Sequence, residues 1–438
     1  MSENIKDQEA ILKKLGIEQL NPMQVAAHEA IANNKEVVLL SPTGTGKTLA
    51  FLLPVLAGLD PNSDQVQVLI LVPSRELAIQ IEQVVREMGS GYKTNAVYGG
   101  RAGSKDKIDL KHAPAILIGT PGRIADHMRR ETIHTDSIKT LILDEFDKSL
   151  EVGFEPEMMD ILDALKTLDK KILTSATQKV EIPDFMDINN PERLDFLGGA
   201  KNQLTLKTVM ASTKDKLESL EQLLGHIGEG SGIIFCNFKD TIQIVSDYLE
   251  GSRISHSCFY GGLEQQDRER ALIKFRNGTS RLLLATDLAA RGIDVPELDF
   301  IIHYQLPPKA EEFTHRNGRT ARMNSSGTAY LLIGKNERIP GFASDIEEEK
   351  IQPSSRFSDS SWTTLFISGG RKDKISKGDI AGLFMKQGGL KKEELGIIEL
   401  KLDCAFVAVP LAKSAQLSQQ LNNSRLKKKK VRISVLKS

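Results

Sequence analysis

Short apolar runs alternate with longer amphipathic stretches along most of the chain. Buried parallel strands separated by helices give this pattern. We therefore predict two tandem α/β domains, each a parallel sheet with helices on both faces. The first set of runs is Val37–Leu40, Val68–Val72, Asn95–Tyr98, Ala115–Gly119, Thr140–Leu143 and Lys171–Thr174. After the segment Leu197–Lys201 the runs are Thr208–Ala211, Gly232–Cys236, Ser255–Tyr260, Arg281–Ala285, Phe300–Tyr304 and Thr328–Ile333.

The last part of the chain has a different pattern, which predicts the order βαββαβ of a small α+β domain of the RNA-recognition-motif type. Its segments are Trp362–Ser368, Lys377–Lys386, Ile397–Leu402, Ala405–Val409, Leu411–Leu421 and Val431–Leu436. Phe366 and Phe406 could stack on bases, but the alternating strand pattern favours a place in the core. We expect domains at 1–198, 207–343 and 361–438, with a polar linker at 344–360.

Charge is distributed unevenly, although the 438 residues hold 58 Lys+Arg and 58 Asp+Glu. Residues 361–438 carry 16 Lys+Arg against 6 Asp+Glu, so an acidic body bears a basic module. The basic module favours a polyanion as binding partner. The alternative is that the module is only a solubilising tail. The three cysteines show no disulfide or metal-ligand spacing, and no signal peptide or membrane span is evident, so we expect a cytoplasmic protein without membrane contact.

A phosphate-binding loop follows the apolar run Val37–Leu40. It reads Ser41-Pro42-Thr43-Gly44-Thr45-Gly46-Lys47-Thr48 and leads into a predicted helix, Leu49–Leu56. Backbone N–H groups of such a loop face an anion, the lysine reaches the outer phosphates, and the last hydroxyl ligates Mg²⁺. We predict nucleotide binding by Ser41, Thr43, Gly44, Thr45, Gly46, Lys47 and Thr48, although an ordinary Gly/Thr-rich turn remains the alternative.

Carboxylates follow a later apolar run that ends at Leu143. Asp144 is the expected Mg²⁺ partner, and Glu145 is placed to orient or deprotonate the attacking water. The hydroxyls of Ser175 and Thr177 could bond to this cluster, which also contains Asp147. A merely acidic loop at a strand end is the alternative.

These residues, together with others in the same order, resemble the DEAD-box ATP-dependent RNA helicases over almost the whole chain. The matching segments include Gln24, Pro73–Ala78, Gly99-Gly100, Thr120–Arg123, Phe235–Asn237, Gln265-x-x-Arg268, Ala285–Asp287, Arg291–Asp294 and His315–Arg322. The resemblance implies two RecA-like domains, ATP and Mg²⁺ as cofactors, and RNA as partner.

The resemblance also implies roles for single residues. Lys47, Asp144, Glu145, Arg319 and Arg322 would be catalytic, the two arginines as fingers on the γ-phosphate; a solvated helix face is their alternative. Gln24 would read adenine and Asp294 would contact the ribose. Asp147, Ser175 and Thr177 would couple hydrolysis to unwinding. RNA would be held by Arg75, Gly100, Thr120, Arg123, Arg268 and Thr286.

Two positions depart from the family pattern. Phe146 stands where the signature tetrad has alanine, which leaves the carboxylates in place but puts their coupling to Ser175 in question. No aromatic residue precedes Phe51, so adenine selectivity would rest mainly on Gln24.

The basic tail is similar to the C-terminal domain of the bacterial DbpA subfamily, in Phe366–Ile375, Gly388–Leu390 and Leu395–Ile398. The resemblance implies a domain that grips a hairpin of large-subunit (23S) ribosomal RNA during ribosome assembly. Its expected RNA contacts are Arg371, Lys372, Lys374, Lys427, Lys428, Lys429 and Lys430. We therefore expect a monomeric RNA helicase that acts on ribosomal RNA and pre-ribosomal particles. An ATP-gated RNA clamp and, less favoured, a DNA translocase remain alternatives.

Overall fold

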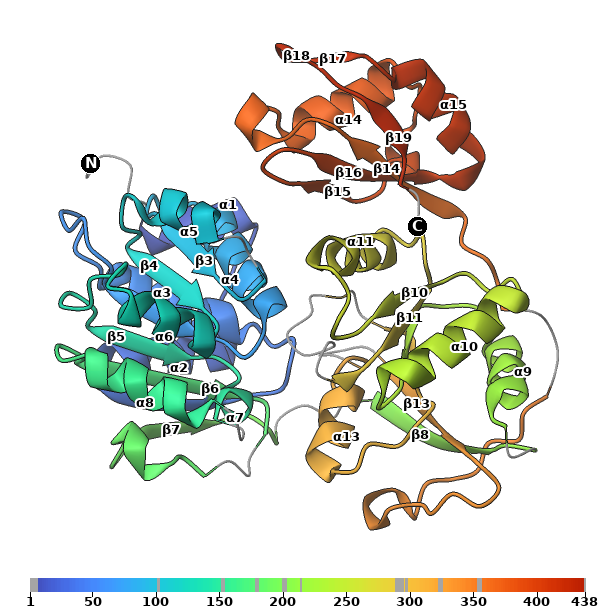
Figure 1. The fold of residues 1–438 in the computed structure, drawn as a ribbon, viewed down its shortest axis with the longest axis horizontal. Coiled ribbons are helices and arrows are strands. Elements are labelled where there is room, and N and C mark those ends of the chain that lie inside the picture. The colour runs from blue at the N-terminus through green and yellow to red at the C-terminus, as the bar shows by residue number, and fades with distance from the viewer. Residues whose placement is uncertain are drawn as a thin grey trace. The chain divides into compact units, whose positions relative to one another are not determined.

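The computed structural model describes residues 7–100, 103–150, 154–177, 181–198, 203–212, 215–287, 295, 298–321, 326–352 and 357–436. The chain forms two compact units that divide after residue 202 (Figure 1). Within the described ranges no helix has the length and apolar character needed to cross a membrane.

A seven-stranded parallel sheet forms the centre of the first unit, as predicted. The outermost strand, β7, was not predicted, because its residues Glu192–Asp195 are mostly exposed and form no apolar run. In spatial order the strands are β3 (Thr94–Val97), β4 (Ile116–Gly119), β2 (Val68–Leu71), β5 (Thr140–Leu143), β6 (Lys170–Ser175), β1 (Glu36–Leu40) and β7 (Glu192–Asp195).

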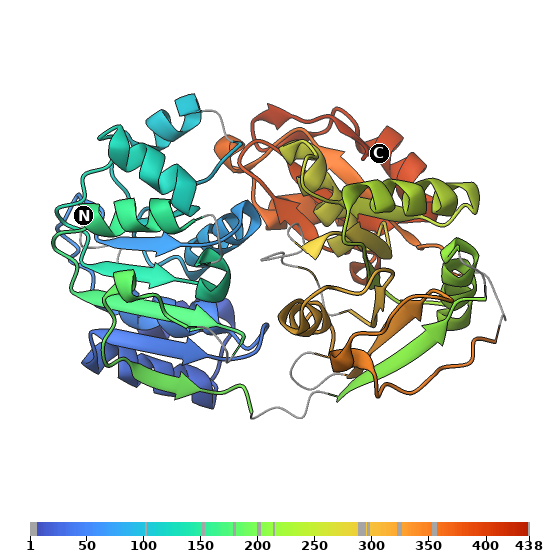
Figure 2. The same cartoon turned by 60° about the horizontal axis from the view of Figure 1, so that its bottom comes forward.

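Helices cover both faces of this sheet (Figures 1 and 2). Successive strand residues point to opposite faces, so Leu39 belongs to one apolar cluster and Leu40 to the other. The first unit contains α1 (Gln8–Leu15), α2 (Pro22–Asn33), α3 (Lys47–Ala57), α4 (Arg75–Met88), α5 (Gly103–Leu110), α6 (Pro121–Arg129), α7 (Phe146–Ser149), α8 (Glu155–Ala164) and the 3₁₀ turn η2 (Asp184–Met186).

The second unit contains a parallel sheet of six strands, again as predicted. In spatial order they are β10 (His256–Phe259), β11 (Leu282–Ala285), β9 (Gly232–Phe235), β12 (Phe300–His303), β13 (Ser326–Ile333) and β8 (Gln203–Met210). The helices packed around it are α9 (Leu217–Ile227), α10 (Lys239–Gly251), α11 (Gln265–Arg276) and α13 (Ala310–Asn317).

The same unit carries a small antiparallel sheet in the order β15-β16-β14-β19, which confirms the predicted βαββαβ order. Two helices and this sheet enclose one apolar core. The elements are β14 (Trp362–Ile367), η4 (Arg371–Asp373), α14 (Lys377–Lys386), η5 (Lys392–Glu394), β15 (Ile398–Leu400), β16 (Ala405–Pro410), α15 (Leu411–Leu421) and β19 (Ile433–Val435), with a hairpin of β17 (Arg425–Leu426) and β18 (Lys429–Lys430) before β19.

The described part of the segment expected as a polar linker contacts the second sheet. After the turn η3 (Gly341–Ala343), Glu348 forms a bridge with Thr208 on the edge strand β8. Phe357 is buried, and its ring meets Phe300 edge to face with the centroids 6.1 Å apart. The many Ser and Glu residues of this segment hid its few apolar anchors from the sequence analysis.

Candidate functional site

Three neighbouring strands of the first sheet, β5, β6 and β1, end side by side at the carboxyl edge. The register pairs Leu40 with Ser175, and the backbone N–H of Ser41 donates to the Ser175 carbonyl at 3.0 Å. Asp144 directly follows β5 at the same edge. The sheet order therefore brings together the phosphate-binding loop, the carboxylates and the Ser175 hydroxyl, and ligands bind at this edge in open α/β sheets.

The phosphate-binding loop is folded around the amine of its own lysine. Lys47 Nζ donates to the carbonyls of Ser41 (2.6 Å) and Pro42 (2.7 Å), and its side chain is buried. The Ser41 and Thr45 hydroxyls lie 2.8 Å apart, and Gly46 has a φ of 87°, which favours glycine. Serine at the first loop position thus has a structural partner within the loop. The remaining predicted residues, Thr43, Gly44 and Thr48, belong to the same loop and the start of α3.

Asn21 and Gln24 attach α2 to this loop. The two residues form a capping box at the start of α2. Asn21 Nδ2 donates to the Thr45 carbonyl at 3.0 Å, and Gln24 Nε2 donates to the Gly46 carbonyl at 3.3 Å. Gln24 was predicted to read adenine. The sequence analysis did not single out Asn21, yet it is a second direct support of the loop.

Asp144 is buried and held by two donors. The Thr174 hydroxyl and the backbone N–H of Glu145 both donate to Asp144 Oδ1, the latter at 3.1 Å. Burial raises the pKa of Asp144, while the positive charge of Lys47 acts in the opposite direction. Glu145 itself has a φ of 51°, a strained backbone position of the kind found at functional sites. The sequence analysis missed Thr174, because a threonine in an apolar run looks like an ordinary strand residue.

Asp147 lies next to the Ser175 hydroxyl, which donates to its Oδ1 at 3.0 Å. The same hydroxyl lies 3.2 Å from Thr177 Oγ1. Burial raises the pKa of Asp147, and Lys148 opposes this effect. Phe146 is fully buried in the apolar core of the first unit. The replacement of alanine by Phe146 therefore leaves the contact between Asp147 and Ser175 in place.

The strands β3, β4 and β2 form the other half of the same sheet edge. Arg75 begins the helix after β2, Gly100 follows β3, and Thr120 follows β4. A Cβ added at Gly100 would lie 2.5 Å from Arg75 Nη1, and the φ of Gly100 is 82°. The positive φ favours glycine here, and a larger residue would also have to displace this guanidinium. The predicted RNA-contacting loops of this unit are thus adjacent, beside the half of the edge formed by β5, β6 and β1.

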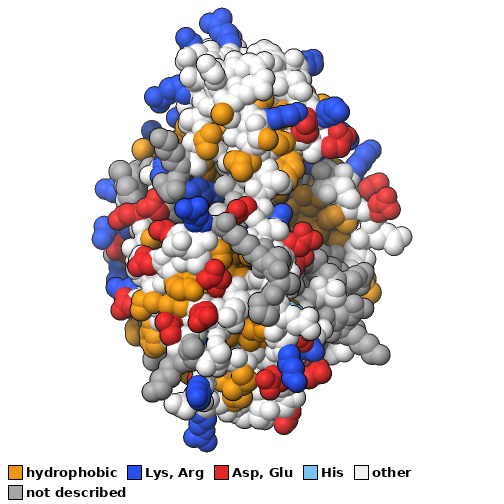
Figure 3. All heavy atoms as spheres, turned by 90° about the vertical axis from the view of Figure 1, so that its right-hand side faces the viewer, with side chains coloured by type: hydrophobic (Ala, Val, Ile, Leu, Met, Phe, Trp, Pro, Cys, Tyr) orange, Lys and Arg blue, Asp and Glu red, His pale blue; other side chains and the backbone are white. Residues whose placement is uncertain are grey.

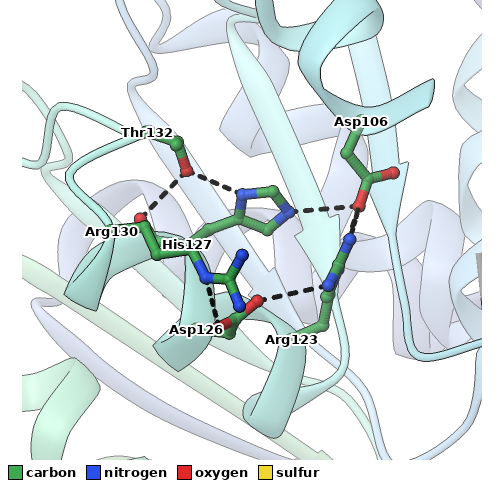
Figure 4. Close-up of polar contacts among 6 residues, drawn as sticks. All are labelled: Asp106, Arg123, Asp126, His127, Arg130 and Thr132. Atoms are coloured by element: carbon green, nitrogen blue, oxygen red, sulfur yellow. Dashed lines mark hydrogen bonds and ion pairs between the residues drawn. The ribbon is translucent and has the colours of Figure 1, made fainter. Parts of the chain in front are cut away.

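Arg123 is held by acidic residues that the sequence analysis did not single out (Figure 4). Its Nε and Nη2 donate to Asp106 Oδ2 at 2.9 and 2.6 Å, and Nη1 donates to Asp126 Oδ2 at 3.2 Å. His127 Nε2 lies 3.1 Å from the same Asp106 oxygen, and His127 Nδ1 lies 2.7 Å from Thr132 Oγ1. Helix α6 is therefore tied to α5 by a polar network around the buried Asp106.

A second buried network surrounds Arg316 in α13. Its guanidinium donates to both carboxylate oxygens of Asp287, to the Gln305 carbonyl at 2.7 Å and to Asn237 Oδ1 at 2.7 Å. These partners follow β11, β12 and β9, so one arginine joins the ends of three strands. Asn237, Asp287 and Arg316 lie in matched motifs but were given no role of their own.

Other predicted residues of the second unit also lie near these strand ends. Arg268 is buried in α11, 4.8 Å above the Phe259 ring, and Thr286 follows β11. Arg319 follows α13 and is buried. Asp294 and Arg322 lie outside the residues that the structure describes.

The small domain presents lysine and arginine side chains to solvent (top of Figure 3). The run Lys427–Lys430 supplies the turn and the second strand of the β17–β18 hairpin. Lys427 pairs with Asp379 and Lys429 with Asp373, both at 2.8 Å. Lys427, Lys428 and Lys430 are exposed. Arg371 and Lys372 lie in the turn η4, and Lys374 follows it. Asp373, which lies in η4, thus joins the predicted basic segment around Arg371 to the lysine run of the hairpin.

Phe406 is buried, as the core interpretation predicts, and Phe366 is half-buried, but neither residue belongs to the apolar core cluster that the sheet and helices of the small domain enclose. Their strand neighbours enter that core, and strand alternation places the two rings on the opposite face, with centroids 5.7 Å apart. On this face the Thr364 hydroxyl accepts from Asn277 Nδ2 at 3.2 Å, and Arg276 donates to Glu399 at 2.7 and 2.8 Å. Residues at the end of α11 therefore engage this face.

Comparison with known proteins gives three family matches. The DEAD/DEAH box helicase model matches residues 21–185, the helicase conserved C-terminal domain matches 215–324, and the DbpA RNA binding domain matches 364–435. The first two cover the loops at the edges of the two large sheets, and the third covers the small domain.

Similar proteins extend over almost the whole chain. The ATP-dependent RNA helicase DbpA of Escherichia coli is 33% identical over 447 residues, covering 97% of this chain and 96% of that protein. Its Bacillus subtilis namesake is 30% identical, with 96% of each chain covered. Among solved structures, S. cerevisiae Dbp5 bound to RNA and ADP BeF3 has a TM-score of 0.68 at 28% identity, covering 78% of this chain and 93% of that chain.

Proposed function

Because the chain belongs to the DEAD-box ATP-dependent RNA helicases of the DbpA type, we propose that it uses ATP to unwind short RNA duplexes locally, at sites in large-subunit ribosomal RNA selected by its small domain. The observation that carries this proposal is the division of one sheet edge into two halves. Loops after β1, β5 and β6 suit a nucleotide, and loops after β2, β3 and β4 suit an RNA backbone.

Hydrolysis would take place at the nucleotide half. The Lys47 amine, which donates to two loop carbonyls here, would turn to the outer phosphates. Glu145 would orient the attacking water and withdraw its proton. Arg319 and Arg322 would stabilise the charge that develops on the γ-phosphate, as the family resemblance implies. Gln24 and Asp294 would hold the adenine and the ribose.

Mg²⁺ fits the oxygen donors at this place. The Asp144 carboxylate and the Thr48 hydroxyl are hard ligands, and Asp144 Oδ1 is already fixed by Thr174 and Glu145. The described residues include no cluster of three or more His, Cys, Asp or Glu side chains able to hold a metal, which suits an ion that shares its ligands with phosphates and water. When bound, the ion would neutralise phosphate charge.

RNA would be gripped through its backbone by the core and selected by the small domain. Arg75, Gly100, Thr120 and Arg123 offer guanidinium and backbone N–H groups, which contact phosphates without reading sequence. Arg268 and Thr286 would add contacts from the second unit. In the small domain, the exposed Lys428 and Lys430 support a role of the hairpin in binding a structured RNA.

The first experiment measures ATP hydrolysis by the purified protein without RNA, with large-subunit ribosomal RNA and with an unrelated RNA of equal length. We expect strong stimulation by ribosomal RNA only, and none in Lys47→Ala. Lys428→Ala/Lys430→Ala should raise the ribosomal RNA concentration for half-maximal stimulation about tenfold, because exposed phosphate contacts are lost. Lys391→Ala/Lys392→Ala, an exposed pair at η5 in the same domain, is the matched control.

The outcomes separate the parts of the proposal. Equal stimulation by both RNAs would retain the helicase and remove selection of ribosomal RNA. Stimulation by neither RNA, with RNA binding that depends on ATP, would favour an ATP-gated clamp. Replacement of RNA by DNA of the same sequence tests the remaining alternative of a DNA translocase.

A further inference from the structure

Arg123 shares its charge between carboxylates that differ sharply in exposure. The Asp106 side chain is fully buried, whereas that of Asp126 is 26% exposed (Figure 4). Asp106 lies on α5, beyond the loop that contains Gly100, and Arg123 and Asp126 lie on α6. The Arg123 guanidinium therefore joins the buried Asp106 to Asp126, which solvent can reach.

Asp106 is the fixed partner. One of its oxygens accepts from Arg123 Nε, from Arg123 Nη2 and from His127 Nε2. Loss of its charge would leave a guanidinium with 18% side-chain exposure without its main counter-ion, and such groups are costly when unpaired. The Thr132 hydroxyl, 2.7 Å from His127 Nδ1, fixes the imidazole from the other side. Asp106 thereby sets the direction of the Arg123 side chain.

Asp126 is the exchangeable partner. It receives a single bond from Arg123, from Nη1 at 3.2 Å, and its other oxygen accepts from Arg130 Nε at 2.7 Å. Arg130 is 68% exposed, so Asp126 can keep this partner after leaving Arg123. Asp106 binds the Nε side of the guanidinium. Once Asp126 has left Arg123, the outer edge of the guanidinium, formed by Nη1 and Nη2, suits the oxygens of one phosphate.

We propose that Asp106 is a positioning residue for the RNA contact of Arg123, and that Asp126 occupies Arg123 in place of an RNA phosphate until RNA displaces it. The proposal rests on the proposed contact between Arg123 and RNA. Asp106 and Asp126 thus act in opposite directions: one prepares the guanidinium for a phosphate, and the other competes with that phosphate.

The test measures binding of a fluorescently labelled single-stranded RNA to the full-length protein with a non-hydrolysable ATP analogue, over a series of salt concentrations. Asp106→Asn should weaken binding about tenfold, because the misdirected guanidinium loses a charge-assisted contact. Its slope of log affinity against log salt should flatten by about 0.7, the value for one phosphate contact on a single strand. Asp126→Asn should tighten binding about twofold to fivefold, since a competing carboxylate becomes neutral.

Two further variants make the result decisive. Arg123→Ala should weaken binding, and Asp106→Asn should then add nothing in that background, because Asp106 acts through Arg123. Asp160→Asn, which breaks the exposed pair of Arg129 and Asp160, is the matched control and should leave the affinity unchanged.

Each contrary result has one meaning. An unchanged affinity and salt slope in Arg123→Ala would overturn the RNA contact itself. A loss in Arg123→Ala without a loss in Asp106→Asn would overturn the positioning role. Weaker binding in Asp126→Asn would overturn the competition and show that the network is only structural. Asp126 is partly exposed, so this last variant tests the idea even if Asp106→Asn fails to fold.

Discussion

Asp287→Asn should strongly destabilise the second unit, because it leaves the Arg316 charge buried without its counter-ion. The Arg316 side chain is 1% exposed and that of Asp287 is 19% exposed. The carboxylate accepts from Nε at 2.6 Å and also from Nη2. The remaining partners of the guanidinium are the Gln305 carbonyl, Asn237 Oδ1 and, at 3.5 Å, His303 Nδ1. All three are neutral and cannot replace a negative charge.

The magnitude follows from this environment. Removal of one member of a buried ion pair costs about 3–5 kcal/mol. The asparagine oxygen still accepts one hydrogen bond, so we expect the lower end, about 3 kcal/mol. In a unit of this size, that change lowers the unfolding temperature by roughly 6–12 °C. Because α13 leads directly to Arg319, we also expect slower RNA-stimulated ATP hydrolysis below that temperature.

The assay can use the single tryptophan of the chain. Trp362 lies on β14 in the second unit, beside Gly278, where an added Cβ would lie 3.9 Å from the Trp362 Cβ, so its fluorescence reports the unfolding of that unit. Asp267→Asn is the control: Asp267 and Arg270 are 3.7 Å apart, at 56% and 39% exposure, and their pair should contribute less than about 1 kcal/mol. A loss below about 1 kcal/mol in Asp287→Asn would refute the reasoning.

Two further predictions concern the loop support and acid stability. Asn21→Ala removes the α2 cap and the bond to Thr45, so the unfolding free energy of the first unit should fall by about 1–2 kcal/mol and the affinity for ATP by a few fold. Asn34→Ala, at the other end of α2, is the control. Equal effects of the two substitutions would contradict the prediction. Burial lowers the pKa of His303 from 6.5 to about 3, aided by Arg316. Below pH 6.5 the unfolded chain therefore takes up a proton that His303 does not take up in the folded chain. Its contribution lowers the unfolding free energy between pH 6.5 and 3 by at most about 1.4 kcal/mol per pH unit. His303→Gln should reduce that slope, and an unchanged slope would contradict the assignment.

The two large sheets were predictable because most of their strands are buried on both faces and appear as apolar runs. The polar edge strand β7 lacks that signal. The order of the strands within each sheet was not predictable in the same way, because pairing joins segments that are far apart in sequence. The sequence placed Ser41, Asp144 and Ser175 at strand ends, but only the order β5-β6-β1 makes those ends neighbours.

The supporting residues were missed for a common physical reason. Asp106 and Arg316 are charged residues in polar helices, where a solvated position is the ordinary expectation. Both are buried, because each has its counter-charge on another element: Arg123 in one case and Asp287 in the other. A sequence motif marks the groups that meet the ligand, whereas the groups that hold them become visible only when distant segments are folded together.

The carboxyl edge of the first sheet also limits how ATP can influence RNA binding. Backbone bonds run across it from one half to the other: Asp144 N–H donates to Leu71 at 3.1 Å, Val72 to Gly119 at 3.0 Å and Thr120 to Val97 at 3.3 Å. With the Arg75–Gly100 and Arg123–Asp106 contacts, this ladder fixes the predicted RNA-contacting loops to a rigid sheet. Packed sheets resist continuous deformation. We therefore expect that a nucleotide at Lys47 has little means of reshaping these predicted RNA-contacting loops from within the first unit.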